Sequence, residues 1–243
     1  MENETKIGMN RTGMQMSPIE GPDQADFAMA MVQPASAEIA AETIDEVRAS
    51  YIRESLRVGS VPLPRTGKGL LSTAMDKMTG KSPEVLIDKL GQRLAFERSG
   101  VRLYEALITK VETMGHTRRD ELCMDLRRIR QEEFEHFQML TSVIQDIGAD
   151  PTAQTPCADI SGVASLGLLQ VITDPRTTVA QSLEAILTAE LTDNACWELL
   201  IELATEVGHE KMAAPFRDAL LAEQQHLVTI KQWLRETVLT EAA

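Results

Sequence analysis

Residues 129–143 read IRQEEFEHFQMLTSV, and this stretch guides the interpretation of the whole chain. Its apolar residues recur at spacings of three and four, which places them on one face of a helix. Glu133 and His136 stand in the middle of that face. A buried carboxylate without a compensating partner costs roughly several kcal/mol. The stretch therefore predicts a helix that carries a polar pair into the interior of a helical protein.

Three further apolar stripes are interrupted in the same way. One repeats the Glu-x-x-His spacing with Glu223 and His226, and the other two carry the single glutamates Glu97 and Glu190. Four helices packed through these faces would bring the carboxylates to one level. The stripes are Leu90, Leu94, Glu97, Val101, Tyr104, Ile108, Val111; Leu122, Leu126, Ile129, Glu133, His136, Leu140, Val143; Val179, Leu183, Ile186, Glu190, Asp193, Trp197, Leu200; and Met212, Phe216, Ala219, Glu223, His226, Ile230, Trp233.

The chain also contains an internal duplication. An offset of 93 residues places Glu97 on Glu190 and Tyr104 on Trp197, and an offset of 90 places the first Glu-x-x-His on the second. Such a repeat predicts two similar helix pairs related by a pseudo-two-fold axis.

The boundary signals predict four long helices, with Pro83 opening the first and Asp174-Pro175 opening the third. The connection over residues 149–173 is much longer than the other two and is expected to hold a short helix. This pattern is typical of an all-α, antiparallel four-helix bundle with one long crossover. We expect a bundle over residues 81–240 and a partly disordered N-terminal extension with short helices over residues 1–80. The predicted helices span about residues 83–114, 117–148, 174–208 and 212–237.

Composition narrows the classes of function. The 243 residues carry a formal net charge of −13, which argues against nucleic-acid binding and suits the attraction of cations. The cysteines Cys123, Cys157 and Cys196 are scattered, which excludes a rubredoxin-type iron site and a disulfide framework. We see no secretory signal and no apolar run of about 20 residues, so we expect a cytoplasmic protein without a membrane contact.

Four carboxylates at one level would repel one another strongly. A pair of divalent cations between them would offset their charge, with one neutral histidine nitrogen on each ion. The alternative is a polar layer that fixes the register of the bundle without metal. We disfavour it because the predicted layer holds acceptors and too few interior donors.

The stretch LAFERSGVRLYEALI over residues 94–108 and the spacing of the six interior ligand candidates resemble the ferritin-like di-metal carboxylate superfamily, which includes bacterioferritin and rubrerythrin. The resemblance implies a ferritin-like bundle in which Glu133 and Glu223 bridge two ions. It implies Tyr104 as a catalytic candidate beside the metals, and Asp193 as a further carboxylate near the site. The implied metal ligands are Glu97, Glu133, His136, Glu190, Glu223 and His226.

The function expected from this resemblance is that of a non-haem di-iron carboxylate protein with two Fe ions. It would oxidise Fe(II), or reduce O2 or H2O2, at a dinuclear centre. The alternatives are an iron-binding or storage protein without turnover, a di-manganese catalase-like enzyme, and a substrate oxygenase with an apolar pocket beside Tyr104. The N-terminal region is expected to serve as a homodimer contact or as a docking arm for a partner.

Overall fold

The structure is a computed structural model that describes residues 20–32, 43–64, 66–78 and 82–243. Within these ranges the regular elements are all helices. The expected disorder of the N-terminal extension falls largely on residues 1–19 and 33–42, which lie outside the described residues. The helices are α1 (Glu20–Val32), α2 (Ile44–Glu54), α3 (Gly67–Met78), α4 (Pro83–Met114), α5 (Arg119–Asp146), α6 (Pro156–Thr173), α7 (Val179–Glu206) and α8 (Glu210–Glu241).

The chain divides into two compact units, with the boundary between Arg57 and Val58. The unit that begins at Val58 contains α3 as well as the long helices, so its start differs from the expected boundary at residues 80–81. In that unit the backbone N–H of Thr66 donates to the carbonyl of Gly148 at 3.3 Å. The segment before α3 is therefore attached to the end of the bundle.

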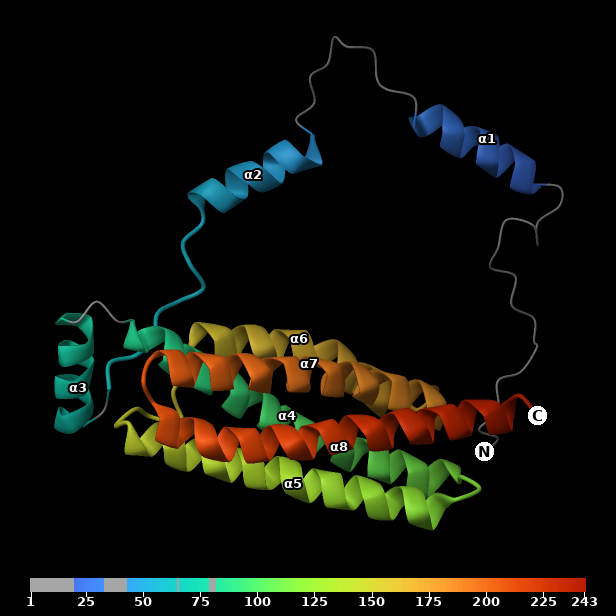
Figure 1. The fold of residues 1–243 in the computed structure, drawn as a ribbon. Coiled ribbons are helices and arrows are strands. Elements are labelled where there is room, and N and C mark those ends of the chain that lie inside the picture. Colours follow the sequence, from blue (N-terminus) through green and yellow to red (C-terminus); the bar gives the residue numbers. More distant parts are fainter. Residues whose placement is uncertain (1–19, 33–42, 65, 79–81) are drawn as a thin grey trace, which may run out of the picture. The chain divides into compact units, whose positions relative to one another are not determined.

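Helices α4, α5, α8 and α7 form a closed four-helix ring, and α6 packs outside it against α4 and α7 (Figure 1). The direction of α6 follows from two contacts with α4. At its start, the N–H of Cys157 donates to Asp88 at 2.8 Å. At its end, Lys110 donates to the carbonyl of Asp174 at 2.9 Å. Helix α6 therefore runs parallel to α4 and returns the chain to the end of α4, where α7 begins in the opposite direction. Neighbouring helices of the ring are thus antiparallel, which confirms the predicted bundle with one long crossover.

The predicted ends of α4 agree with the structure, whereas the predicted start of α7 does not. Pro83 occupies the first turn of α4, and Gly115 ends the helix with a φ of 80°, as predicted. The predicted start of α7 at Asp174 was wrong. Thr178 caps α7 instead, because its side chain accepts from Gln181 N–H while the Gln181 side chain accepts from Thr178 N–H. This reciprocal capping satisfies the amides of Thr178 and Gln181 at the start of the helix.

Two apolar clusters fill the bundle on either side of the polar layer. One contains Leu107 and Leu126, and the other contains Leu90 and Phe216. The stripes of α5, α7 and α8 are buried nearly as predicted. On α4 the stripe is shifted, since Val101 and Ile108 are only half-buried, whereas Gly100, Leu103 and Leu107 are buried. Helix α6 causes this shift because it covers a further face of α4.

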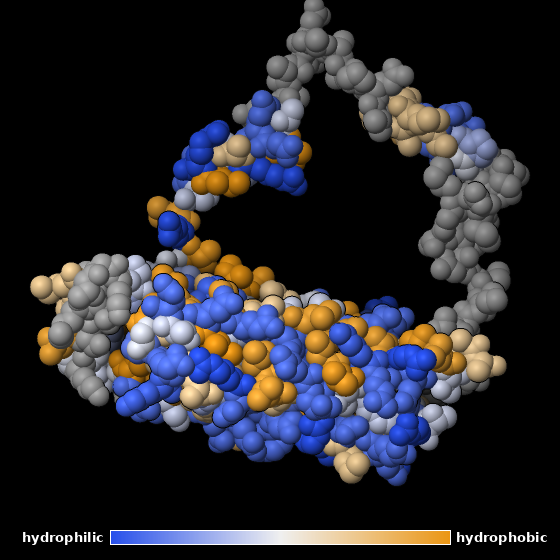
Figure 2. Space-filling model, in the orientation of Figure 1, coloured by the Kyte–Doolittle hydropathy of each residue, from blue (hydrophilic) through white to orange (hydrophobic). Residues whose placement is uncertain are grey.

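Helix α6 carries a mostly apolar outer face, on which Ile160, Val163 and Leu166 are more than half exposed. Its 18 residues have a mean hydropathy of 1.3, and 22% of them are buried. By length and composition alone, α6 is long and apolar enough to cross a membrane, a test that core helices of soluble proteins also pass. In Figure 2, hydrophobic patches lie among hydrophilic residues along the side of the bundle where α6 runs.

Candidate metal centre

The six predicted ligands meet in one layer at the middle of the bundle, although they come from four different helices. Helices α4 and α7 each provide one glutamate, and α5 and α8 each provide a glutamate and a histidine one turn apart. The layer is closed to solvent: the relative exposure is 0% for Glu97, 1% for Glu133, 9% for His136, 2% for Glu190, 0% for Glu223 and 0% for His226.

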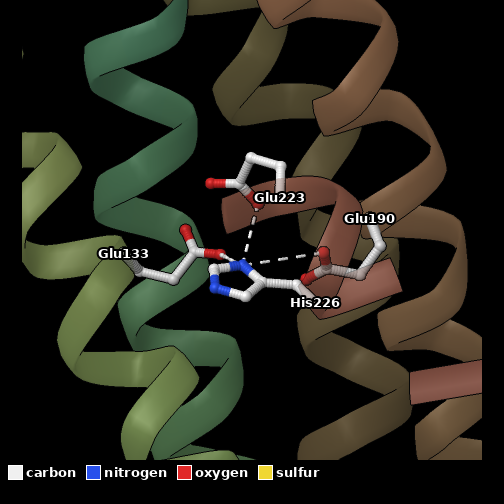
Figure 3. Close-up of side chains that lie close together, drawn as sticks. All are labelled: Glu133, Glu190, Glu223 and His226. Carbon is white, nitrogen blue, oxygen red and sulfur yellow. Dashed lines mark hydrogen bonds and ion pairs between the residues drawn. The ribbon is translucent and has the colours of Figure 1, made fainter. Parts of the chain in front are cut away.

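His226 faces three carboxylates from three helices (Figure 3). Its Nδ1 atom lies 2.9 Å from Glu223, 3.7 Å from Glu133 and 4.0 Å from Glu190. One ligand atom from each of these four residues lies within 4.8 Å of every other. Such a group of three carboxylates and one imidazole has the composition of a site for a divalent transition metal.

His136 lies at the centre of a second group. Its Nδ1 atom is 2.6 Å from Glu223 and 3.7 Å from Glu97. The three residues also satisfy the 4.8 Å criterion, and Asp193 joins Glu97, Glu133 and Glu223 in an overlapping group. Glu223 therefore belongs to both histidine groups, as expected of a residue that bridges two ions. The sequence expectation that Asp193 lies beside the site is confirmed by its position in this overlapping group.

Two further side chains, Tyr104 and Arg93, donate to carboxylates of the layer. The hydroxyl of Tyr104 on α4 donates to Oε1 of Glu190 on α7. Nη2 of Arg93 donates to Oε1 of Glu97 at 2.7 Å and forms an ion pair with Asp193. Arg93 is 1% exposed, so this is a buried cation within the layer.

The donors do not satisfy the layer. Among the described residues, one oxygen of each glutamate is buried without a hydrogen bond: Oε2 of Glu97, Oε2 of Glu133, Oε2 of Glu190 and Oε1 of Glu223, the last of which has only the ion-pair contact with Nδ1 of His136. Unsatisfied carboxylate oxygens are costly in a protein interior. A cation between them is the group that four such acceptors would compensate, so the residues present fit a metal centre.

Burial and neighbouring charges shift the pKa values of the layer's residues in different directions. Burial, reinforced by the charge of Glu223, raises the pKa of Glu190 to about 8. Burial would also raise the pKa of Glu223, but its contacts with the two histidines lower it to about 2. Burial disfavours the charged form of His136, yet its contacts with Glu223 and Glu97 raise its pKa to about 9. Without metal, the histidines thus act as cations of the layer together with Arg93.

A glycine makes space for the layer, and an asparagine side chain holds two of its helices together. A Cβ atom added at Gly100 would overlap the carboxylate of Glu133, so the glycine one turn after Glu97 makes space for that side chain. On the other helix pair, Nδ2 of Asn194 donates to the carbonyl of Glu190 at 2.9 Å and to that of Glu223 at 3.1 Å. Asn194 therefore fixes α7 and α8 relative to each other at the level of the site.

Sequence reasoning missed two residues of the site. Arg93 lies four residues before Glu97 and hence on the same helix face, a spacing that could have identified it. Glu132 lies outside the apolar stripe of its helix, so the stripe did not include it. It is half-buried, and its carboxylate lies 2.7 Å from Nε2 of His226. The expectation of too few interior donors must be corrected, since Arg93 supplies a charged one.

Comparisons with known proteins bear on the family of the chain. The chain is similar, at 21% identity, to a structure described as ferritin-like, diiron-carboxylate proteins from Bacillus anthracis str. Ames. The match covers 61% of this chain and 94% of that chain, with a TM-score of 0.49. A comparison with curated proteins found no match. A family model described as the ferritin-like domain matches residues 87–239, which are the four bundle helices and the crossover, and the chain therefore belongs to the ferritin-like domain family.

Proposed function

We propose that this protein is a non-haem di-iron carboxylate protein that oxidises Fe(II), or reduces O2 or H2O2, at a dinuclear centre. The observation that carries the proposal is the set of four buried glutamates that each keep one oxygen without a hydrogen bond. A polar layer whose role is only structural would be expected to satisfy its acceptors internally.

Two ion positions are proposed from the two histidine groups. Glu97 and His136 would hold one ion, and Glu190 and His226 would hold the other. Glu223 belongs to both groups, and Glu133 occurs with Glu190 and His226 as well as with Glu97. Glu133 and Glu223 are therefore the proposed bridging ligands. Two dications would balance the charge of the four glutamates.

Residues around the ligands would hold protons in place. Nε2 of His226 faces the Glu132 carboxylate. A proton on Nε2 would therefore leave the lone pair of Nδ1 directed at Glu223 and the proposed ion. Burial and the nearby Glu190 raise the pKa of Tyr104 well above its usual value, so its hydroxyl stays protonated and donates to Glu190. Iron bound here would supply one electron per ion to O2 or H2O2.

Anaerobic loading with two equivalents of Fe(II), followed by O2 or H2O2, tests the proposal. We expect Fe(II) oxidation faster than in buffer, and repeated consumption of the oxidant when ascorbate is present. Glu190→Gln should abolish the acceleration. Glu198→Gln should not, because Glu198 is exposed on the same helix and lies away from the layer. Equal oxidation rates with and without the protein would contradict the proposal.

The same experiment separates the alternatives. Accumulation of many more than two irons per chain without repeated turnover would indicate storage. Evolution of O2 from H2O2 by manganese-loaded protein, without a reductant, would indicate a catalase-like enzyme. Carboxylate and imidazole ligands suit iron and manganese alike, so the metal must be identified by measurement.

The N-terminal unit is proposed to serve as a docking arm or homodimer contact. Helix α1 exposes Phe27, Met29 and Met31, with 64–71% of each residue accessible. Helix α2 has no buried residue. Sedimentation of the full chain and of a chain lacking residues 1–57 would test a homodimer contact, which predicts that only the full chain forms dimers.

A further inference from the structure

The two halves of the polar layer are not equivalent, although the helix pairs that build them are. Glu97 and Glu190 occupy equivalent positions, but Glu97 accepts from the charged Arg93, whereas Glu190 accepts from the neutral Tyr104. The two proposed ion positions therefore have different surroundings, and this inference rests on the function proposed above.

Arg93 is held firmly where it lies. It is 1% exposed, and its guanidinium carbon lies 4.6 Å from the ring of Phe96 and 5.3 Å from that of Trp197. One nitrogen, Nη2, contacts both Glu97 and Asp193, while Nε and Nη1 have no hydrogen-bond partner among the described residues. A single nitrogen thus ties two carboxylates to one another.

The duplication shows that this ion pair, which joins α4 to α7, has no counterpart on the other side of the layer. With the offset of 93 residues, Ile186 occupies the position equivalent to Arg93, and Gly100 occupies the position equivalent to Asp193. Helix α4 therefore adds a cation, and α7 adds a carboxylate, on the Glu97 side of the layer alone. Asp193 is close enough to act as a ligand, since it groups with Glu97, Glu133 and Glu223 within 4.8 Å.

We propose that Arg93 makes the two metal positions unequal, by keeping Asp193 and one oxygen of Glu97 from the ion held by His136. That ion would lie near a fixed positive charge and have fewer carboxylate oxygens available. The ion held by His226 has no such neighbour, because its terminal ligand Glu190 accepts only from Tyr104 and its histidine is supported by Glu132. The His226 position fills first, and the His136 position is the weaker and more readily exchanged one.

Anaerobic titration with Co(II), a probe that does not turn over, tests this directly. Free Co(II) is measured by equilibrium dialysis, and the bound ions by their visible absorption. The wild-type protein should bind two ions in separate steps, with affinities at least about tenfold apart. Arg93→Met should release Asp193 as a ligand and strengthen the second step until the two steps merge. Unresolved steps in the wild type, or a second step unchanged in Arg93→Met, would overturn the proposal.

Asp193→Asn keeps the test decisive if Arg93→Met does not fold. With Asp193 held by Arg93, it is not a ligand in the wild type, so Asp193→Asn should change neither affinity by more than about threefold. A tenfold weaker second step would show that Asp193 binds the ion, which contradicts the proposal. Tyr104→Phe is the matched control at Glu190 and should change the first step alone, because Tyr104 donates to Glu190 and not to Glu97. Absence of any bound Co(II) in the wild type would instead refute the proposed metal centre itself.

Discussion

The Nε2 atom of His226 lies 2.7 Å from a carboxylate oxygen of Glu132, a residue 94 positions away on the adjacent helix. Glu132 in turn accepts from Arg128 at 2.8 Å and is partly open to solvent. The fully buried histidine is therefore oriented by a chain of contacts that ends at the protein surface.

Glu132→Gln should lower the metal affinity of the His226 position about 10- to 100-fold, which is the usual effect of removing the carboxylate behind a ligating histidine. A competition titration against a chromophoric chelator would measure it. Glu135→Gln is the control, since Glu135 is exposed on the same helix and accepts only from Gln131. Equal affinities for the two variants would show that Glu132 does not support the site.

Gly100→Ala should reduce metal binding more than about tenfold while the helices persist, because its Cβ atom would displace the Glu133 carboxylate. Elemental analysis and far-ultraviolet circular dichroism would report the two properties separately. Gly162→Ala in α6 is the matched helical control, since its added Cβ meets nothing within 4 Å. That control should keep its metal and gain about 0.5–1 kcal/mol in the free energy of unfolding.

The metal-free protein should lose stability as the pH rises from about 5 to 9. The pKa of Glu190 is raised to about 8, so its proton stabilises the fold fully below the ordinary value of 4.5 and this contribution is lost as the pH rises through 8. His136, whose pKa is raised to about 9, contributes below 6.5 and ceases to contribute above 9. Thermal unfolding in EDTA across this range would show a falling midpoint.

Glu190→Gln is the control for this pH dependence, because it removes the carboxyl that titrates between 4.5 and about 8. The decline in the unfolding midpoint should be shallower in this variant. A midpoint that stays constant or increases from pH 5 to 9 in the wild-type protein would contradict the electrostatic description of the layer.

Removing residues 1–57 should leave the metal stoichiometry and the unfolding midpoint of the bundle unchanged, because the compact unit begins at Val58. Removing residues 1–70 should lower the midpoint. The longer deletion takes away Thr66, which donates to Gly148, and Gly69, which lies against the backbone of Gly148. Differential scanning calorimetry of both chains distinguishes these outcomes, and a large loss of metal in the shorter deletion would place the arm within the fold.

The sequence predicted the fold well where local chemistry is strong. Pro83 and Gly115 mark both ends of α4, because one lacks the amide that a first turn leaves unused and the other adopts a positive φ. The start of α7 was misplaced since Asp174-Pro175 resembles a helix start as closely as Thr178 does. The burial of Gly100 and Leu107 could not be anticipated without knowing that α6 covers α4.

The residues of the candidate site could likewise be predicted only in part. Its six ligand candidates stand at helical spacing on apolar faces, so periodicity places each of them on the inner face of its helix. Arg93 and Glu132 depend on contacts between helices: the partner Asp193 lies 100 residues after Arg93, and His226 lies on a helix adjacent to that of Glu132. Such pairs follow from how the helices are arranged in the ring, which periodicity within one helix does not specify.

The most direct test of the central claim is the metal content per chain after anaerobic Fe(II) loading and gel filtration. The wild-type protein should retain about two irons, as expected of paired glutamate and Glu-x-x-His ligands. Glu133→Ala/Glu223→Ala should retain none, because both proposed bridging ligands are gone. Retention of about two irons by both proteins, or of none by the wild type, would contradict the assignment of a dinuclear centre to this layer.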